Sequence, residues 1–315
     1  MTNTNTARAA VAQSQAPWEQ PWWHAKGRDL SIFLWIMLIH VTAVVGLVMY
    51  PLPGWRVLAG AIALVFIGGL GTTVGYHRAL AHRSVRLHPW VRSLLIFFAM
   101  FNGSGAPTTW AAGHRLHHAK ADTPEDISSP VWGGFWWAHL RWLWQAGEPP
   151  VERYCPEMSG YEYRAFRWFQ PAILTVSYFG GLVFGWPAFF WLGAIRLCFG
   201  LHAQCFVNSV CHTEPGIQIG EDSSRNVRWL ALVHFFQGEN WHRNHHSRPG
   251  SARLGWSWRE PDAGWIVIRG LEMLGLATDV RVPTQEELRA ARAARRGVRR
   301  VIAPSRLPGQ LDSAA

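Results

Sequence analysis

Eight of the fifteen histidines in this 315-residue chain fall in three short boxes. The boxes are HRALAH at residues 77–82, HRLHH at 114–118 and HRNHH at 242–246. On a helix, positions i, i+3 and i+4 lie within an arc of about 100°, so each HxxHH box is expected to direct three imidazoles at one point. His77 and His82 are five residues apart, about 140° on a regular helix. Either the helix is loosened there or each of the two binds a different metal.

Imidazole at this density predicts a metal site with more than one ion. Zinc sites take three or four protein ligands, so eight or nine histidines imply two ions. Imidazole suits zinc, copper, iron and nickel, and the lack of thiolate in the boxes argues against copper(I) and iron–sulfur clusters. We favour a pair of redox-active irons that activate dioxygen, with two coppers as the alternative. We interpret His24, His88 and His234 as ordinary histidines, exposed or hydrogen-bonded, and not as ligands.

Four other histidines lie outside the boxes. His212, in NSVCH, and His139, in FWWAHL, are considered together with the boxes. His40 and His202 stand alone in apolar segments, and we assign them no metal role.

The composition indicates a membrane protein. Only 16% of the residues are charged, and the chain has 20 tryptophans, a residue enriched at membrane interfaces. A net charge of +10 alone would suit nucleic acid, but long uncharged apolar runs argue against that partner and favour anionic lipid or an anionic substrate. Four cysteines without CxxC spacing make a zinc ribbon or a disulfide framework improbable. No cleavable signal peptide is evident, so the first apolar run is expected to be an uncleaved membrane anchor.

Apolar runs predict four transmembrane helices in two hairpins. Residues 31–50 and 57–76 form the first hairpin around PLPGW, and residues 171–185 and 188–210 form the second around GWP. A further run at residues 91–106 contains polar residues and is expected to be an interfacial or bundle-buried helix. The expected fold class is therefore an all-α membrane protein with four transmembrane helices.

Two hairpins return the chain to one side of the membrane, so the N-terminus, residues 77–169 and everything after residue 211 share a face. Residues 77–169 carry ten Arg or Lys, whereas the opposite turns carry only Arg56, so the positive-inside rule makes the shared face cytoplasmic. The boxes are then expected to meet in a cytoplasmic helical cap that holds a dimetal site. The chain is expected to be a multi-pass membrane protein with its catalytic face in the cytoplasm.

Three parts are expected along the chain: a polar N-terminal segment at 1–30, an integral-membrane domain at 31–283, and a basic helix with a disordered tail at 284–315. Thr284 and Glu287 have capping-box spacing. The basic sequence after them forms either a solvated helix or a helix that lies on anionic lipid.

The ordered motifs resemble the membrane fatty acid desaturases, in particular their stearoyl-CoA and bacterial acyl-lipid Δ9 branch. The resemblance rests on HRALAHRS, WAAGHRLHH, GFWWAHLRW, FVNSVCH and GENWHRNHH, and it covers roughly residues 55–280. The metal ligands that it implies are His77, His82, His114, His117, His118, His212, His242, His245 and His246, with Asn208 reaching one iron through water. It also implies that Trp110 lines a bent acyl channel and that His139 lies outside the ligand set.

The resemblance implies dioxygen-dependent desaturation of a fatty acyl chain, carried by CoA or by lipid, with two iron ions and a cis double bond near Δ9. Removing hydrogen from an unactivated methylene needs an oxidant that side chains alone do not supply. The sequence departs from the acyl-CoA branch at Ala112 and Gly113, which replace Arg-Asp, so a charged contact to CoA is missing. Residues 125–127 replace the family's DPH. An external ferredoxin or cytochrome b5-like protein, docked on the basic face, is the expected electron donor.

Two other functions remain open from the sequence. A hydroxylase of alkyl or lipid chains uses the same oxidant but adds one oxygen instead of removing a second hydrogen, so the mass of the product separates the two. A histidine-rich metal transporter is disfavoured, because the boxes lie outside the expected spans and those spans hold few ionisable groups. Membrane lipid is an expected partner and nucleic acid is not.

Overall fold

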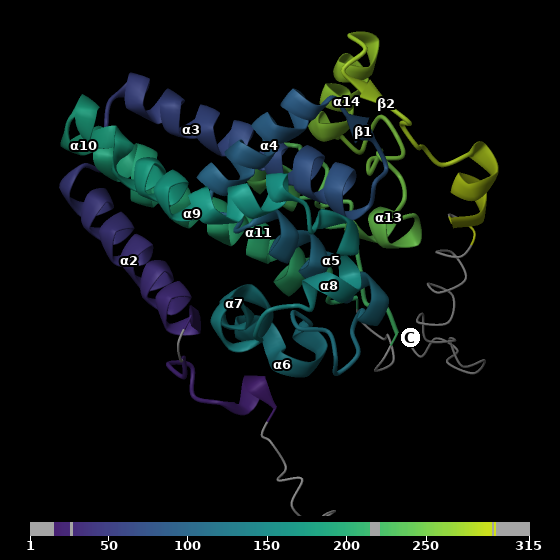
Figure 1. The fold of residues 1–315 in the computed structure, drawn as a ribbon, viewed down its shortest axis with the longest axis horizontal. Coiled ribbons are helices and arrows are strands. Elements are labelled where there is room, and N and C mark those ends of the chain that lie inside the picture. Colours follow the sequence, from purple (N-terminus) through teal and green to yellow (C-terminus); the bar gives the residue numbers. More distant parts are fainter. Residues whose placement is uncertain (1–15, 26–27, 215–220, 292, 294–315) are drawn as a thin grey trace, which may run out of the picture.

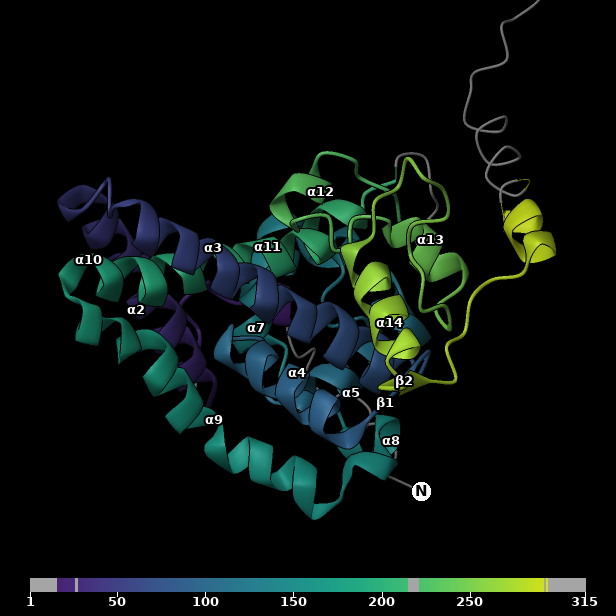
Figure 2. The ribbon, with the colours of Figure 1, turned by 90° about the horizontal axis from the view of Figure 1, so that it is seen from above.

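The computed structural model describes residues 16–25, 28–214, 221–291 and 293, and this part of the chain is mostly helical (Figure 1). It contains one short antiparallel strand pair, β1 Arg86–Leu87 with β2 Ala277–Thr278. The long helices lie side by side toward one end of the molecule, and shorter helices gather at the other end (Figures 1 and 2). The predicted all-helical class is confirmed, apart from that strand pair.

Three helices of the described residues are long and apolar enough to cross a membrane. They are α2, Arg28–Met49; α3, Trp55–Leu70, with its π-helical continuation Gly71–Ala81; and α10, Trp186–Ala188, which continues through a π-helix, Phe189–Ile195, into α11, Arg196–Cys211. At about 1.5 Å per residue, even the shortest of these three spans reaches about 30 Å, the thickness of a bilayer core. The predicted first hairpin is therefore present as α2 and α3.

The fourth predicted span, residues 171–185, lies in α9, Tyr161–Phe179, and in the 3-10 turn Gly180–Phe184 that follows it. The first half of α9 carries charged residues, among them Arg164 and Arg167, so only its second half is apolar. That apolar part rises about 20 Å, which is less than the ~30 Å bilayer core. The helix is present, whereas the count of four spans stays a prediction.

The apolar run at 91–106 forms α4, Pro89–Phe101, which is too short to span. It packs against the π-helical part of the second span, where a Cβ on Gly71 would lie 2.5 Å from the backbone nitrogen of Ala99 and from the carbonyl oxygen of Leu95. Only glycine permits this approach. As a result α4 lies between the second span and α9 (Figure 2).

Short helices and turns surround the ends of the second and third spans and form a helical cap. They are η1, Pro17–Glu19; α5, Pro107–Lys120; α6, Pro130–Trp136; the π-helix Trp137–Arg141; α7, Trp142–Gln145; α8, Val151–Tyr154; the turn Pro156–Met158; α12, Leu230–Val233; α13, His242–Ser247; and α14, Ala263–Met273. Figure 2 shows α5, α13 and α14 close together at this end of the molecule. The cytoplasmic location of the cap stays a prediction.

A buried ion pair joins the C-terminal part of the cap to the second span. Nη2 of Arg78 lies 2.8 Å from Oδ1 of Asp262, and both side chains are almost fully buried. Arg78 also donates to the carbonyl oxygens of Ala252 and Gln237, and Asp262 accepts from the backbone N–H of Leu254. The pair thereby positions the segments on both sides of the third histidine box against the first box.

We expect Asp262→Ala to destabilise the fold by about 3–5 kcal/mol, because Arg78 would stay buried without its charge partner. Thermal unfolding of the purified protein in detergent would show this as a lower midpoint. Arg86→Ala is the control, because its ion pair with Asp279 is exposed and such pairs contribute little. Equal midpoints for the two variants would contradict the role of the buried pair.

The predicted capping box is present at the start of the C-terminal helix. The backbone N–H of Thr284 donates to Oε2 of Glu287 at 2.8 Å, and the backbone N–H of Glu287 donates to Oγ1 of Thr284 at 3.2 Å. The predicted tail from residue 294 and the first fifteen residues lie outside the described part of the chain. The domain boundaries at 30 and 283 stay predictions.

Candidate metal centre

The nine predicted histidines come together in two groups. The five-histidine group contains His77, His82, His114, His118 and His245, and the four-histidine group contains His117, His212, His242 and His246. Within each group the candidate ligand atoms all lie within 4.8 Å of one another. Segments more than a hundred residues apart in the sequence therefore supply one site.

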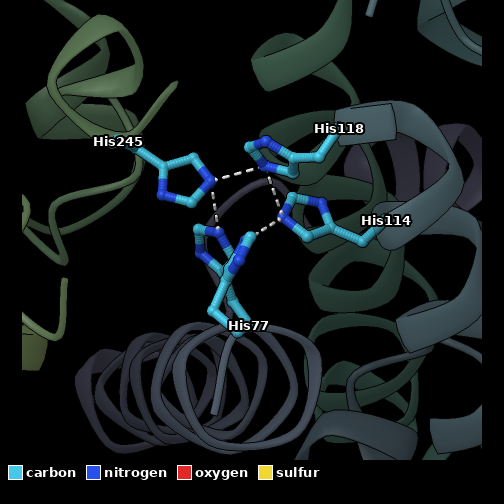
Figure 3. A group of neighbouring side chains, drawn as sticks. His77, His114, His118 and His245 are labelled. Atoms are coloured by element: carbon cyan, nitrogen blue, oxygen red, sulfur yellow. Dashed lines mark hydrogen bonds between the residues drawn. The ribbon is translucent and has the colours of Figure 1, made fainter. Parts of the chain in front are cut away.

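In the five-histidine group, rings from three elements converge on one centre (Figure 3). Nε2 of His118 lies 2.7 Å from Nε2 of His245 and 3.1 Å from Nε2 of His114. Nε2 of His77 lies 3.0 Å from Nε2 of His245. His82 completes the group, with its Nε2 atom 2.8 Å from that of His114.

His77 and His82 share a group because the helix is widened between them. Gly71–Ala81 is a π-helix, and the backbone N–H of His82 donates to the carbonyl oxygen of His77 at 3.0 Å. This i→i+5 bond closes one π-helical turn, which brings both side chains to the same face. Of the two alternatives that the sequence left open, the loosened helix is correct.

In the four-histidine group, Nε2 of His242 lies 2.9 Å from Nε2 of His212 and 3.1 Å from Nε2 of His246. Nε2 of His117 lies 3.3 Å from Nε2 of His246. His117 comes from α5, and His212 is the residue at which α11 ends. His242 and His246 are one turn apart on α13.

One expectation about the boxes is wrong: the three rings of an HxxHH box do not face one point. His114 and His118 belong to the five-histidine group, while His117 belongs to the other. In the third box, His245 is separated in the same way from His242 and His246. Positions i and i+4 differ by only about 40° around a helix, whereas i+3 lies about 100° from i+4. The three side chains of one box therefore spread over enough of the helix surface to reach two neighbouring metal centres.

The separations within each group fit ligands of a single ion. Metal–nitrogen distances of about 2.0–2.1 Å place adjacent ligand nitrogens about 2.9–3.4 Å apart in octahedral or tetrahedral geometry. The Nε2 separations of neighbouring rings run from 2.7 to 3.3 Å. The two groups therefore have the dimensions of two adjacent metal sites.

Four carboxylates accept hydrogen bonds from Nδ1, the ring nitrogen that faces away from the centre of each group. None of the four was predicted as a site residue from the sequence. Nδ1 donates across 2.9 Å from His77 to Glu239, 2.9 Å from His117 to Asp126, 3.1 Å from His212 to Asp122, and 3.1 Å from His246 to Asp222. Three of them, Asp122, Asp126 and Glu239, lie within eight residues of a box, which was a usable signal in a chain with 20 acidic and 30 basic residues. Asp126 was noted only as a departure from the family pattern.

These bonds determine where the hydrogens lie in the four-histidine group. An ionised carboxylate only accepts, so in their neutral forms His117, His212 and His246 carry their hydrogen on Nδ1 and a lone pair on Nε2. The lone pairs of His117 and His246 then face each other at 3.3 Å. Such an arrangement is repulsive unless a cation lies between the nitrogens, and carboxylate–histidine–metal triads have this form. The residues present fit a metal ion.

Burial keeps most of these rings neutral. Burial, assisted by the charges of neighbouring rings, lowers the pKa well below its usual value for His82, His114, His118, His242 and His245. His117 differs: burial lowers its pKa, but the charge and hydrogen bond of Asp126, together with the charges of Asp122 and Asp222, outweigh burial and raise it. Burial raises the pKa of Glu239, but His77, with the charge of Arg78 and the hydrogen bond from Thr73, outweighs this and lowers it to about 2. Neutral rings with ionised partners are the protonation states that metal binding needs.

A cavity of about 830 Å³ reaches both groups and extends between the spans to α2, α9 and α11. The site residues that line it include His77 and His114 of the five-histidine group, and His117 and His242 of the other. Apolar side chains, such as Ile39 on α2, line its part between the spans. A long apolar ligand can therefore lie in this cavity beside both groups.

The two other predicted site residues also line this cavity. The ring of Trp110, one turn before His114 on α5, stacks on that histidine with centroids 5.1 Å apart and planes 20° apart. Asn208 lies one turn before His212 on α11. Their roles in binding substrate and iron stay predictions. The histidines that the sequence left outside the ligand set lie outside both groups: His24, His40, His88, His139, His202 and His234.

Comparison with known proteins identifies the class of enzyme. Residues 53–262 match the model of the fatty acid desaturase family. The chain therefore belongs to the fatty acid desaturase family. It is an oxidoreductase, a fatty acyl desaturase of lipid metabolism.

Individual relatives align with this chain over most of their length. Delta-9 acyl-lipid desaturase 1 of Arabidopsis thaliana is 33% identical over 286 residues, which cover 88% of this chain and 90% of the relative. Delta-9 acyl-lipid desaturase 2 of the same plant is 36% identical over 245 residues, covering 75% and 78%. The sn-1 stearoyl-lipid 9-desaturase of Synechocystis sp. is 31% identical over 291 residues, covering 88% and 86%.

Proposed function

We propose that this protein is an acyl-lipid Δ9 desaturase, which introduces a cis double bond near carbon 9 of a fatty acyl chain held in a lipid. The observation that carries the proposal is the pair of histidine groups that border a largely apolar 830 Å³ cavity. The acyl-lipid carrier is supported by the names of the relatives. It is also supported by Ala112 and Gly113, which offer no charged contact to CoA.

The two groups are proposed to hold two iron ions, with five histidines at one and four at the other, and with Asn208 reaching the second through water. When bound, the irons and dioxygen supply the oxidant that removes two hydrogens from adjacent methylenes. Four carboxylates behind the rings balance the charge of two divalent cations, which makes such a pair acceptable in a buried site. His77, His117, His212 and His246 are held in orientation by those carboxylates.

The chain's own residues would bind and orient the substrate. Trp110 forms the cavity wall beside His114, so it limits where the acyl chain passes the five-histidine group. Polar residues, among them Asp29, Arg167 and Gln170, line another part of the cavity and suit the ester end of a lipid. The apolar walls would exclude water from the reacting carbons.

Electrons are proposed to come from an external ferredoxin or cytochrome b5-like protein. The basic segment 77–169 offers a docking surface of the right sign for an acidic donor. We propose with it that the catalytic face is cytoplasmic and that the chain crosses the membrane four times. The fourth pass would be α9 with its continuation.

The test is fatty acid analysis of cells that express the wild type or the His117→Ala variant. The wild type should produce a monounsaturated acid in the lipid fraction with its double bond at carbon 9, and the variant should produce none. A product heavier by one oxygen would favour the diiron hydroxylase instead. Desaturation of acyl-CoA but not of lipid-bound acyl chains in membranes from these cells would overturn the lipid carrier.

A further inference from the structure

A third cluster of candidate metal ligands lies apart from the two histidine groups. It contains His40 on α2 with Cys198 and His202 on α11, and their ligand atoms all lie within 4.8 Å of one another. Cys198 and His202 are one helical turn apart, so they share a face of α11. The sequence analysis assigned neither histidine, because only the packing of α2 against α11 brings them together.

The cluster lies deep within the spans. All three residues belong to the candidate spans Asp29–Met49 and Trp186–Cys211. His40 is about 18 Å along the axis from the first residue of α2 and about 14 Å from the last. Ionisable side chains at this depth are costly in lipid and mark functional sites unless they are fully paired.

A hydrogen bond to the backbone determines which ring nitrogen of His40 carries the hydrogen. Nδ1 of His40 lies 2.7 Å from the carbonyl oxygen of Ile36. A carbonyl only accepts, so the hydrogen of a neutral His40 is on Nδ1 and the lone pair is on Nε2. That lone pair faces Nε2 of His202 at 3.0 Å.

A chain of hydrogen bonds through His139 determines which ring nitrogen of His202 carries the hydrogen. The hydroxyl of Ser209 donates to the carbonyl oxygen of Cys205 at 2.9 Å, so it accepts from Nδ1 of His139, which is also 2.9 Å away. His139 then has its lone pair on Nε2, which accepts from Nδ1 of His202 at 2.8 Å. His202 is left with a lone pair on Nε2. Two lone pairs thus face each other between His40 and His202.

We propose that His40, Cys198 and His202 bind one copper(I) ion. A cation turns the opposed lone pairs from a repulsive contact into two ligand bonds, and a metal-bound thiol loses its proton. Two imidazoles with one thiolate form a three-donor set that suits copper, and soft sulfur ligands select copper(I).

Charge and ligand number favour copper(I) over zinc. Copper(I) and one thiolate are together neutral, whereas zinc would leave a net positive charge in the apolar middle of the spans. Structural zinc sites almost always have four ligands, and the described residues supply three donors here.

The test uses the purified full-length protein, loaded with iron so that the two desaturase groups are filled. It would be titrated anaerobically with copper(I) against a coloured chelator, and X-ray absorption at the copper edge would identify the ligands. We expect about one copper per chain, with a single copper–sulfur distance. Loss of an outer partner of a metal ligand costs ~10–100-fold in affinity, so loss of the thiolate in Cys198→Ser should cost at least about 100-fold.

Cys155→Ser is the matched control, because Cys155 is a free cysteine that packs in a separate apolar cluster with Tyr76 and Met158. It should keep both the affinity and the sulfur signal. His40→Gln is a second site variant and should weaken binding, while unchanged iron content in all variants shows that they are folded.

Four results would overturn the proposal. Copper bound only through nitrogen, or with equal affinity in Cys198→Ser and the wild type, would place the copper elsewhere. Preference for zinc over copper(I) in competition would exclude the metal that we assign. No binding would mean that the Ser209 hydroxyl donates to His139 instead, which leaves a neutral chain of hydrogen bonds.

Discussion

Replacing His212 by alanine should reduce desaturation at least about 100-fold, because several kcal/mol of transition-state stabilisation depend on an intact metal site. The iron content should fall from about two to about one per chain. His212 belongs to the smaller group, and Asp122 holds its ring through Nδ1, so no neighbouring residue replaces it easily. Iron analysis by mass spectrometry and chromatography of the fatty acids measure the two effects.

His88→Ala is the control for this variant. His88 is an exposed histidine just before α4 and lies in neither group. It should keep both its iron and its activity. Two irons retained in His212→Ala, together with lost activity, would contradict the role of His212 as a ligand.

Replacing Asp122 by asparagine should weaken iron binding by about 10- to 100-fold, with a similar loss of activity. Oδ2 of Asp122 accepts from Nδ1 of His212 and from both the backbone N–H and the hydroxyl of Ser223. Burial raises the pKa of Asp122, but the hydrogen bonds from His212 and Ser223 lower it well below its usual value. The asparagine keeps the shape and removes the charge that makes the ring of His212 a better ligand.

Asp222→Asn is the matched comparison for this effect. Asp222 makes the same bond to His246 at 3.1 Å, but its side chain is 42% exposed, whereas that of Asp122 is fully buried. Water can solvate and partly replace an exposed partner, so the loss in Asp222→Asn should be clearly smaller. Equal losses in the two variants, measured by iron titration, would refute the argument from burial.

The sequence by itself determined which histidines are candidates for the metal site and what chemistry they suit. All nine lie in the two groups: eight are marked by the box motifs, which are local patterns, and His212 by the resemblance to the desaturases. The first hairpin and the third long span follow from apolar run length in the same way. The fourth span stays a prediction, because the helix that contains it, α9, has a charged N-terminal half and only its second half is apolar.

The tertiary structure alone decided how those side chains are divided and supported. The elements packed around α5 supply two centres, so that His117 joins a different group from His114 and His118, and the widened π-helix brings His77 to His82. The carboxylates, such as Asp122 at His212, and the pairing of His40 with His202 depend on contacts between segments far apart in the chain. Spacing along one helix sets directions around that helix, whereas partners on other elements are set by packing, which no local pattern records.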